Sequence, residues 1–389
     1  MTPLTPGGPA AAPEPVGATI GVEQELHVVD AHTYAALDDD ALSSAVLHGE
    51  AGRHVHAEIA TTQVEAATGV CRTLEELRSS LAAARAEAAA AAATVGGAVL
   101  AASTHPFAGW ADQRLTSGPR YLTLYERWGV LALQQVICSC HVHVAVPDLD
   151  TAVTVMDHVR PYLPLVLALT GSSPFHEGTD TGYDSYRTQW FDRWPITGPP
   201  EPLGDAGSYL GLVYGLKAAG VIDDASNLYW DVRPSSRYPT LEFRVADVAT
   251  DLDDSLLHAA LVRSLTRVLD ARDRTGRPAP EVRPELLRAA RWRAARYGIQ
   301  GQLFDPVRLE LVDAPVAVRR LLEELRDDLT EHGEWDEVSA LTEQLLARGT
   351  SAQRQRAVLH RTGDLRSVAE MLVRESQPPP GPPSTPPCA

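Results

Sequence analysis

Lysine is almost missing from this 389-residue sequence. Lys217 is the only one, and arginine supplies the rest of the Lys and Arg charge. A phosphate-binding loop ending in Gly-Lys-Ser/Thr is therefore excluded, because Gly215-Leu216-Lys217 lacks the flanking residues of that motif. A phosphate group would have to be bound by arginine, by a metal ion or by backbone amides. High-GC codon usage, which fits the many alanine, arginine and proline residues, also accounts for the missing lysine.

The sequence also lacks an excess of positive charge. Its formal net charge of −17 argues against nucleic acid or an anionic membrane as a partner, since both require a basic surface. No apolar run reads as a membrane span, and the first residues lack the basic and apolar regions of a signal peptide. A cytoplasmic location is therefore expected. An anionic substrate would have to be held by local arginine or metal.

Cysteine is scarce as well. The four cysteines have neither the spacing of a zinc finger nor that of a disulfide framework, and they are Cys71, Cys138, Cys140 and Cys388. Cys138 and Cys140 share one face of an expected strand and fit reduced thiols in a core. Cys388 lies in the proline-rich end of the chain, where the sequence suggests no role for it.

The organisation of the chain is simple. Residues 1–17 are expected to be a disordered tail and 376–389 a proline-rich disordered tail. Between them, residues 18–375 show no internal repeat and no break in composition, so we predict a single catalytic domain. With 44% hydrophobic residues it can bury a sizeable core.

Strands and helices follow from apolar periodicity and from capping and turn residues. The expected strands are 19–29, 54–68, 99–103, 135–146, 229–232 and 240–245. The expected helices are 74–94, 121–131, 150–169, 208–219, 251–272, 283–297, 314–331, 335–347 and 351–375. Thr73 to Glu76 forms a capping box before the first helix, and Pro161 and Pro164 should kink the third. Residues 172–202 are expected to be a long loop. The pattern predicts an α+β fold with a mainly antiparallel sheet, surrounding helices and a helical C-terminal part.

Three strand-like stretches each place two strong polar side chains two positions apart. The pairs are Glu23 with Glu25, His141 with His143, and Glu242 with Arg244. Residues i and i+2 of a strand share a face, so each pair points the same way. Several unpaired carboxylates in a half-buried site cost several kcal/mol each, and a divalent metal ion with an anionic substrate is the simplest explanation.

Each pair also has a less specific interpretation. Taken alone, Glu23 and Glu25 fit the solvated face of an edge strand, and Glu242 with Arg244 fits a cross-strand ion pair. Glu58 and Glu65 lie in the next strand-like region and add only a weak signal by themselves. The ligand set as a whole is carboxylate with some imidazole and no thiolate, which favours Mg²⁺ or Mn²⁺ over structural Zn²⁺.

Taken together, these residues resemble the carboxylate–amine ligase group, that is, the type 2 glutamate–cysteine ligase family, which is related in fold to glutamine synthetase. The resemblance spans roughly residues 18–370. The matching segments, in order, are Gly21–Leu26, Glu58–Glu65, Ser103–Phe107, Cys140–Val144, Ser172–Phe175, Thr181–Arg187 and Thr240–Arg244. Each is short, but seven in the right order make a specific signal. Two positions depart from the common family pattern: Gln24 stands where Glu is usual and Ala145 where Gly is usual.

The resemblance implies ATP-dependent ligation with Mg²⁺ or Mn²⁺. ATP would phosphorylate the γ-carboxylate of glutamate, and an amine, typically that of cysteine, would attack the acyl phosphate. By matching positions, the implied metal ligands are Glu23, Glu25, Glu58, Glu65, His141 and Glu242. Arg244 and Arg233 would stabilise the transferring phosphoryl group, and His143 would contact nucleotide or phosphate. Arg187 would bind the substrate carboxylate, and Gln63 would orient the substrate.

Three other functions remain open from the sequence. A metal-dependent amidase or other hydrolase could use the same cluster, although the arginines between Arg233 and Arg244 argue against it. A phosphotransferase such as a guanidino kinase could stop at a stable phosphorylated product, and a sensor of amino acids or nucleotides could keep the scaffold without turnover. The expected partners are small amino-acid substrates, with no nucleic acid and no membrane. The amine substrate and the choice between a monomer and a homo-oligomer cannot be read from the sequence.

Overall fold

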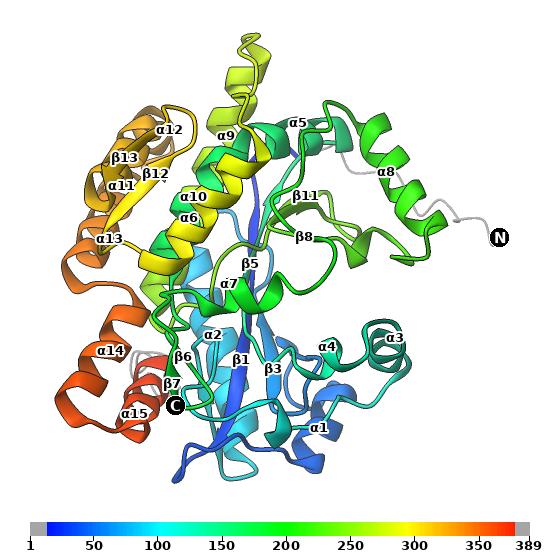
Figure 1. Cartoon of the computed structure of the whole chain (residues 1–389), viewed down its shortest axis with the longest axis vertical. Coiled ribbons are helices and arrows are strands. Elements are labelled where there is room, and N and C mark those ends of the chain that lie inside the picture. Colours follow the sequence, from blue (N-terminus) through cyan, green and yellow to red (C-terminus); the bar gives the residue numbers. More distant parts are fainter. Residues whose placement is uncertain (1–13, 378–389) are drawn as a thin grey trace, which may run out of the picture.

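The computed structural model describes residues 14–377. An antiparallel sheet of seven strands runs through the molecule, with helices packed around it (Figure 1). Its order is β10-β11-β5-β1-β3-β2, and β4 also pairs with β1. These strands are β1 (Ile20–Asp30), β2 (Val55–Ala57), β3 (Gln63–Ala67), β4 (Gly97–Leu100), β5 (Cys140–Ala145), β10 (Val232–Pro234) and β11 (Thr240–Phe243). The α+β prediction with a mainly antiparallel sheet is confirmed.

The register of the sheet brings the predicted polar residues into line. Glu23 of β1 lies opposite His141 of β5, and Glu25 lies opposite Glu65 of β3. Further along, Glu242 of β11 lies between His143 of β5 and Arg233 of β10. Residues directly opposite one another in an antiparallel pair point to the same face. One face of the sheet therefore holds nearly all of the predicted site residues.

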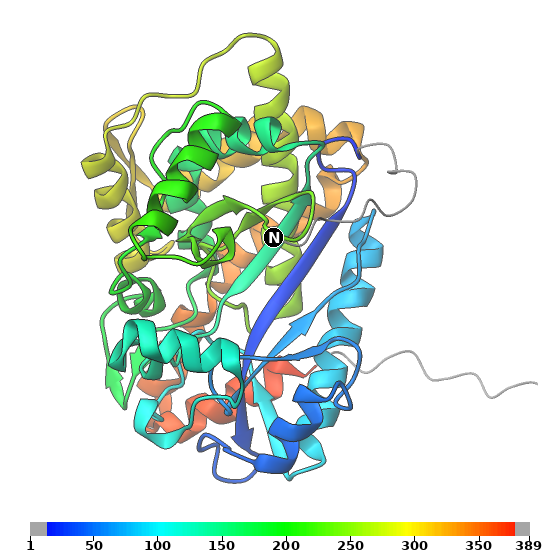
Figure 2. The same ribbon diagram turned by 90° about the vertical axis from the view of Figure 1, so that its right-hand side faces the viewer.

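The opposite face of β1 packs against two long helices, α2 (Leu74–Ala93) and α9 (Leu252–Arg274). Gln24 points to that side, where its amide binds Ser255 of α9 and accepts hydrogen bonds from Arg85 of α2. α9 is buried on most of its surface and links the sheet to the helices beyond it. Figure 2 shows α2 on one side of β1 and α3 on the other. Around these polar contacts, buried apolar side chains of β1, α2 and α9 share one core cluster behind the polar face.

The remaining helices surround this core. They are α1 (Asp40–Leu47), α3 (Pro119–Trp128), α4 (Val130–Leu133), α5 (Leu149–Val159), α6 (Leu163–Thr170), α7 (Tyr186–Phe191), α8 (Ala206–Ala218), α10 (Pro284–Tyr297), α11 (Ala314–Glu324), α12 (Arg326–Glu331), α13 (Trp335–Arg348), α14 (Ser351–Thr362) and α15 (Leu365–Ser376). α14 and α15 pack on each other, and their apolar side chains share a core cluster with Val29 and Leu100. None of the helices in the described part of the chain is long and apolar enough to cross a membrane.

Several predicted helices are divided. The helix expected over 150–169 breaks at a short 3-10 turn, Arg160–Tyr162, between α5 and α6. Pro161 lies in that turn, and its lack of an N–H accounts for the break. The helix expected over 314–331 becomes α11 and α12, and that over 351–375 becomes α14 and α15, which are separated by Gly363 in the left-handed conformation (φ 68°).

Other segments differ from the sequence prediction. Residues 172–202 hold helix α7 and three strands of two residues each: β6 (Phe175–His176), β7 (Thr179–Asp180) and β8 (Thr197–Gly198). β8 pairs in parallel with β9 (Tyr229–Trp230). β12 (Gln302–Asp305) and β13 (Glu310–Asp313) form a hairpin that the sequence did not reveal, and residues 135–139 precede β5 rather than belonging to it.

Most of the two predicted tails, with Cys388, lies outside the described residues. The described ends are well attached. Gly17 donates a backbone hydrogen bond to Ala145, at 2.9 Å, beside the end of β5. The hydroxyl of buried Ser376 accepts one from the backbone N–H of Ala101, at 2.8 Å. The described contacts therefore reach slightly beyond residues 18–375 at both ends.

Candidate active site

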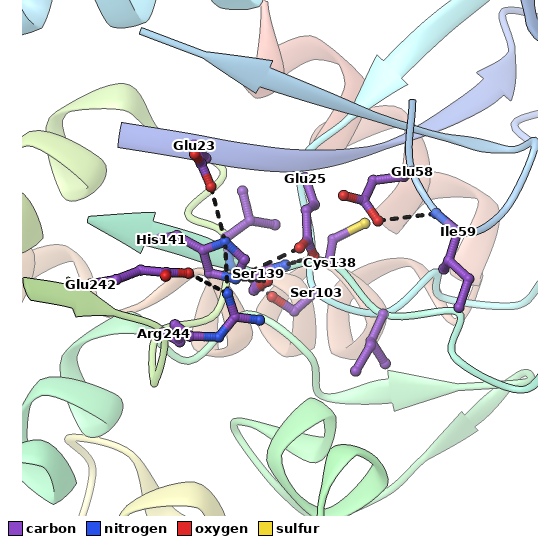
Figure 3. Close-up of polar contacts among 12 residues, drawn as sticks. Glu23, Glu25, Glu58, Ile59, Ser103, Cys138, Ser139, His141, Glu242 and Arg244 are labelled. Atoms are coloured by element: carbon purple, nitrogen blue, oxygen red, sulfur yellow. Dashed lines mark hydrogen bonds and ion pairs between the residues drawn. The ribbon is translucent and has the colours of Figure 1, made fainter. Parts of the chain in front are cut away.

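The predicted site residues on the polar face come from β10, β11, β5, β1 and β3, from the position just after β11 and from the turn that joins β2 to β3. Figure 3 shows those of β1, β5 and the turn, together with Glu242 and Arg244. Strand parity places them together, since alternate residues of each strand face the same way. The face has two halves. Carboxylates dominate over β1 and β3, and arginines dominate over β10 and β11.

Glu23 lies between the two histidines of β5. Its carboxylate is 3.3 Å from Nδ1 of His141 and 3.3 Å from Nε2 of His143. Nε2 of His141 is 2.8 Å from the hydroxyl of Ser139, so a neutral imidazole can donate from Nδ1 and accept at Nε2. Burial, together with the charge of Arg244, lowers the pKa of His141 and favours this neutral form. Burial alone would raise the pKa of Glu23, but its contacts with both histidines outweigh that and hold it below its usual range.

Glu242 lies between two arginines. Arg233 donates to both of its oxygens, at 2.8 and 3.0 Å, and Arg244 donates to Oε1 at 2.5 Å. Burial would raise the pKa of Glu242, but the charges of Arg244 and Arg233 hold it below its usual range. Arg244 also reaches His141, with Nη1 and Nδ1 3.5 Å apart. This group binds phosphate well in principle, because two guanidinium groups share one carboxylate and keep a net positive charge.

Glu25, Glu58 and Glu65 form the acidic half. Glu25 accepts a hydrogen bond from the backbone N–H of Ser139 at 2.6 Å, and Glu58 accepts one from Ile59 at 3.0 Å. Burial and the neighbouring charge of Glu25 raise the pKa of Glu58 to about 8. Burial and the charges of Glu23, Glu58 and Glu25 raise the pKa of Glu65 well above its usual range. The carboxylates therefore repel one another when no cation is bound between them.

This donor set fits a divalent metal ion. Within residues 14–377, no three histidine, cysteine, aspartate or glutamate side chains are already grouped closely enough to hold one. Crowded carboxylates with raised pKa values are nevertheless stabilised by a bound cation, which removes both the repulsion and the uncompensated charge. The oxygen-rich set, with imidazole alongside, suits Mg²⁺ or Mn²⁺.

Gln63 lies at the start of β3, beneath the acidic half. It is buried, and its amide nitrogen donates to the carbonyl of Ile137 at 2.8 Å and contacts the sulfur of Cys138 at 3.2 Å. Its amide oxygen has no partner among the described residues. Cys138 itself is a fully buried free thiol, as expected, and burial raises its pKa well above the usual range. Gln63 thus has one free acceptor beside the carboxylates.

Arg187 is oriented differently from a typical ligand-binding arginine. It lies on α7, is buried, and donates to the backbone carbonyls of Arg244 (2.9 Å) and Val245 (3.2 Å). Its charge is balanced by Asp247, 3.6 Å away and fully buried. These contacts fix the main chain beneath Arg244. The geometry therefore favours support of Arg244 over the predicted contact with a substrate carboxylate.

The sequence did not reveal the contacts of Asp247, and it did not single out Arg120. Asp247 accepts hydrogen bonds from Ser172, Ser173 and Ser185 at 2.7–2.9 Å and so ties the 172–187 segment to the end of β11. The charge of Arg120, at the start of α3, opposes the rise in the pKa values of Glu58 and Glu65. No local sequence motif marks either residue, since each affects residues that lie far away in the sequence. The serines of the 172–187 segment were the only available hint.

Comparisons with known proteins match almost the whole chain to one family. The profile of the family described as glutamate-cysteine ligase family 2 (GCS2) matches residues 19–371. A protein of Frankia alni, provisionally named glutamate–cysteine ligase 2-2, is 40% identical over 372 residues, which cover 92% of this chain and 97% of that one. One of Saccharopolyspora erythraea, provisionally named glutamate–cysteine ligase 2-1, is 41% identical over 361 residues, covering 92% and 95%.

The fold is also similar to that of a solved structure. Glutamate–cysteine ligase from Francisella tularensis, crystallised with AMP, superposes with a TM-score of 0.68. The alignment covers 96% of this chain and 91% of that one, at 13% sequence identity. At that identity the likeness concerns the fold alone.

Proposed function

The chain belongs to glutamate–cysteine ligase family 2, and on that premise we propose that it is an ATP-dependent carboxylate–amine ligase that joins glutamate to cysteine. The products would be γ-glutamylcysteine, ADP and phosphate. The provisional names of its relatives support these substrates, and the fold it shares with an AMP-bound ligase supports the use of ATP.

The observation that supports the proposal most is the division of one sheet face into an acidic and a cationic half. A ligase of this kind must bring a carboxylate to the γ-phosphate of ATP, which means bringing anions together. Arg233 and Arg244 lie where a phosphoryl group could be neutralised, and Glu242 between them fixes their positions. The glutamates on β1 and β3 lie beside them and would face the same substrate.

The proposed reaction has two steps. The γ-carboxylate oxygen of glutamate attacks the γ-phosphorus, the bond to the ADP oxygen breaks, and an acyl phosphate forms. The amine nitrogen then attacks the acyl carbon, phosphate leaves, and the nitrogen loses its proton. The chain's arginines would stabilise the charge on the transferring phosphoryl group by fixed electrostatics.

Metal ions would support this chemistry at the polar face. Mg²⁺ or Mn²⁺, when bound, neutralises phosphate oxygens and orients them. The residues that would hold it are Glu23, Glu25, Glu58, Glu65, His141 and Glu242. His143 would contact the nucleotide or phosphate, and its Nδ1 is held by the hydroxyl of Thr240 at 2.9 Å. Gln63 would orient the substrate through its free amide oxygen.

Phosphate release from Mg·ATP by the purified protein tests the proposal. Glutamate is kept fixed while a panel of amines is varied, and the product is identified by mass spectrometry. We expect release that requires glutamate, is greatest with cysteine and yields a γ-glutamyl product. A matched control replaces glutamate with its γ-amide, glutamine, which has no free γ-carboxylate.

The alternatives give different results in the same assay. Release with another acid–amine pair would keep the mechanism and change the substrates. ATP-dependent formation of a stable phosphorylated product would indicate a phosphotransferase. Amide cleavage without nucleotide would indicate a hydrolase, and absence of turnover with every pair and either metal would indicate a sensor.

A further inference from the structure

Helix α14 is hydrogen-bonded to the segment of residues 172–187, and it lies close to β7 of that segment (Figure 1). Its buried Gln355 donates from the side-chain amide to the carbonyl of Ser172 at 2.9 Å. On the first turn of the helix, the hydroxyl of Ser351 lies 2.6 Å from that of Thr250. Helix α14 is therefore attached both to the start of this segment and to the chain that follows β11.

Arg356, the next residue along α14, binds the later part of the same segment. Its Nε and Nη2 donate to the carboxylate of Asp180 at 2.9–3.2 Å, and its Nη1 donates to Asp184 at 2.5 Å. Nη2 also donates to the carbonyl of Tyr183 at 2.7 Å. The side chain of Asp184 is only 3% exposed, whereas that of Arg356 is 24% exposed. A half-buried arginine thus fixes a buried carboxylate and the main chain beside it.

Asp184 is in turn connected to the residues that hold Arg187. The backbone N–H of Ser173 donates to the carbonyl of Asp184 at 3.0 Å. The hydroxyl of Ser173 donates to Asp247 at 2.7 Å and accepts a hydrogen bond from the backbone N–H of Arg187 at 3.0 Å. Ser185, the residue after Asp184, also donates to Asp247, at 2.8 Å. A displacement of Asp184 therefore displaces two serines that fix Asp247 and Arg187.

The contacts of Arg356 differ from those of an ordinary surface ion pair, which usually contributes little. Arg319 of α11 and Glu343 of α13 form such an ordinary pair, since both side chains are more than half exposed. Arg356 instead has one buried partner, Asp184, and that partner belongs to the segment that ends at Arg187. Its hydrogen bonds therefore constrain the main chain from which Arg187 extends.

We propose that Arg356 is a positioning residue for catalysis: through Asp184 and its neighbours it fixes Arg187, which holds the main chain of Arg244. The inference rests on the proposed ligase function and deepens it, because Arg244 would stabilise the transferring phosphoryl group. Electrostatic stabilisation is effective when the charge is already in place before the reaction. A displacement of about 1 Å, caused far from the reacting atoms, can lower the rate about 100-fold. Helix α14 accordingly belongs to the framework of the polar face.

Steady-state kinetics of R356Q, R356K and the control R319Q test the proposal. We expect R356Q to lower kcat for phosphate release about 10- to 100-fold, with the KM values for ATP and glutamate within about threefold of wild type. R356K keeps the charge but cannot form the guanidinium fork, so its kcat should lie between those of wild type and R356Q. R319Q removes an arginine that joins two other helices and should leave kcat unchanged.

A double-mutant cycle with R187K tests whether Arg356 acts through Arg187. If it does, R356Q should lower the kcat of the R187K protein by less than about threefold, because the support of Arg244 is already weakened there. Hydrogen exchange measured by mass spectrometry gives a second readout that needs no turnover. Residues 181–187 and 240–248 should exchange faster in R356Q than in wild type, while R319Q should match wild type.

Several results would overturn the assignment. A kcat of folded R356Q close to wild type would show that the contacts of Arg356 are structural only. A change confined to the KM for glutamate or ATP would place its effect on substrate binding, and losses that multiply in the double variant would show that Arg356 and Arg187 act independently. Circular dichroism checks the fold of each variant. If R356Q does not fold, D180N, which removes the more exposed partner, should lower kcat by a smaller factor, and an unchanged kcat would refute the proposal.

Failure of the ligase reaction would be recognised separately. If wild type shows no ATP turnover with any acid–amine pair, the proposed function is wrong. Hydrogen exchange of residues 240–248 then decides alone whether Arg356 fixes the main chain of Arg244: faster exchange in R356Q supports it, and unchanged exchange refutes it.

Discussion

Glu58 illustrates a conflict between stability and function at single residues. Burial, together with the neighbouring charge of Glu25, raises its pKa to about 8 in the protein without metal. At neutral pH without metal, folding therefore requires the Glu58 carboxyl to take up a proton. We expect E58Q to increase the free energy of unfolding by about 1–2 kcal/mol under these conditions, because the neutral amide removes that cost. It should also abolish ATP turnover. Urea unfolding in EDTA and phosphate release measure the two effects.

The control for this prediction is E50Q. Glu50 is exposed and belongs to no ion pair in the described part of the chain, so its removal should change neither property. A loss of stability in E58Q, or turnover close to wild type, would contradict the metal-ligand role of Glu58.

Arg187 and Asp247 form the second residue-scale test. Removing either member leaves a buried charge beneath Arg244, so we expect R187Q and D247N each to cost about 3–5 kcal/mol of unfolding free energy. The double variant should lose less unfolding free energy than the two single variants added together, since it leaves neither charge buried without its partner. Urea unfolding of the four proteins gives the coupling.

Kinetics then separate support of Arg244 from direct substrate contact by Arg187. Support predicts that R187K, which keeps the charge, recovers stability and lowers kcat while the KM for glutamate stays near wild type. A rise confined to the KM for glutamate would show instead that Arg187 binds the substrate, as the sequence suggested.

At this scale, strand parity was sufficient to predict which of the candidate site residues share a face. Glu23, Glu25, His141, His143 and Glu242 lie on one face because alternate residues of paired strands must do so. The carbonyl partners of Arg187 and the position of Arg120 could not be found in this way. Both depend on how α7 and α3 dock on strands more than fifty residues away in sequence.

Among the elements, α9 contains a group that should make the protein sensitive to acid. His258 is buried against apolar side chains, and burial lowers its pKa to about 4. Below pH 6.5 His258 binds a proton in the unfolded chain but stays neutral in the folded protein. Stability is therefore lost as the pH falls from about 6.5 to about 4. At pH 5 this amounts to about 2 kcal/mol.

The variant H258L should remove that loss. Urea unfolding at pH 7.5 and pH 5 should show that wild type loses about 2 kcal/mol more than the variant over this interval. Asp254 faces the same region, and its pKa, raised to about 6 by burial, shifts stability in the opposite direction. It is present in both proteins, paired with Arg348, and cancels in the comparison. Equal losses would show that His258 does not govern the acid response.

The elements themselves were predicted unevenly. β1, α2, α9 and α10 were recognised because apolar periodicity and caps such as Thr73 are local signals. The hairpin β12–β13 and the helix α7 were missed. Their short lengths give little periodicity, and they are stabilised by packing against α10, which only the folded chain provides.

For the molecule as a whole, net charge governs encounter with anionic substrates. A formal charge of −17 repels Mg·ATP at long range, and the arginines of the site act only at short range. We expect kcat/KM for ATP to rise severalfold as ionic strength increases from about 10 mM to about 150 mM, since the Debye length falls from about 30 Å to about 8 Å. The kcat/KM for cysteine, a zwitterion, serves as the control. A fall with added salt would show that local arginine charge dominates the approach.

The single lysine has a chemical consequence if the site makes the proposed acyl phosphate. Such intermediates acylate amines, and a lysine beside the reacting atoms would be modified by the enzyme's own product of the first step. Lys217 lies exposed in the last turn of α8, and every cation on the polar face is arginine or histidine. A guanidinium protonated at all working pH values is a poor nucleophile. The polar face therefore presents no lysine amine to the proposed acyl phosphate.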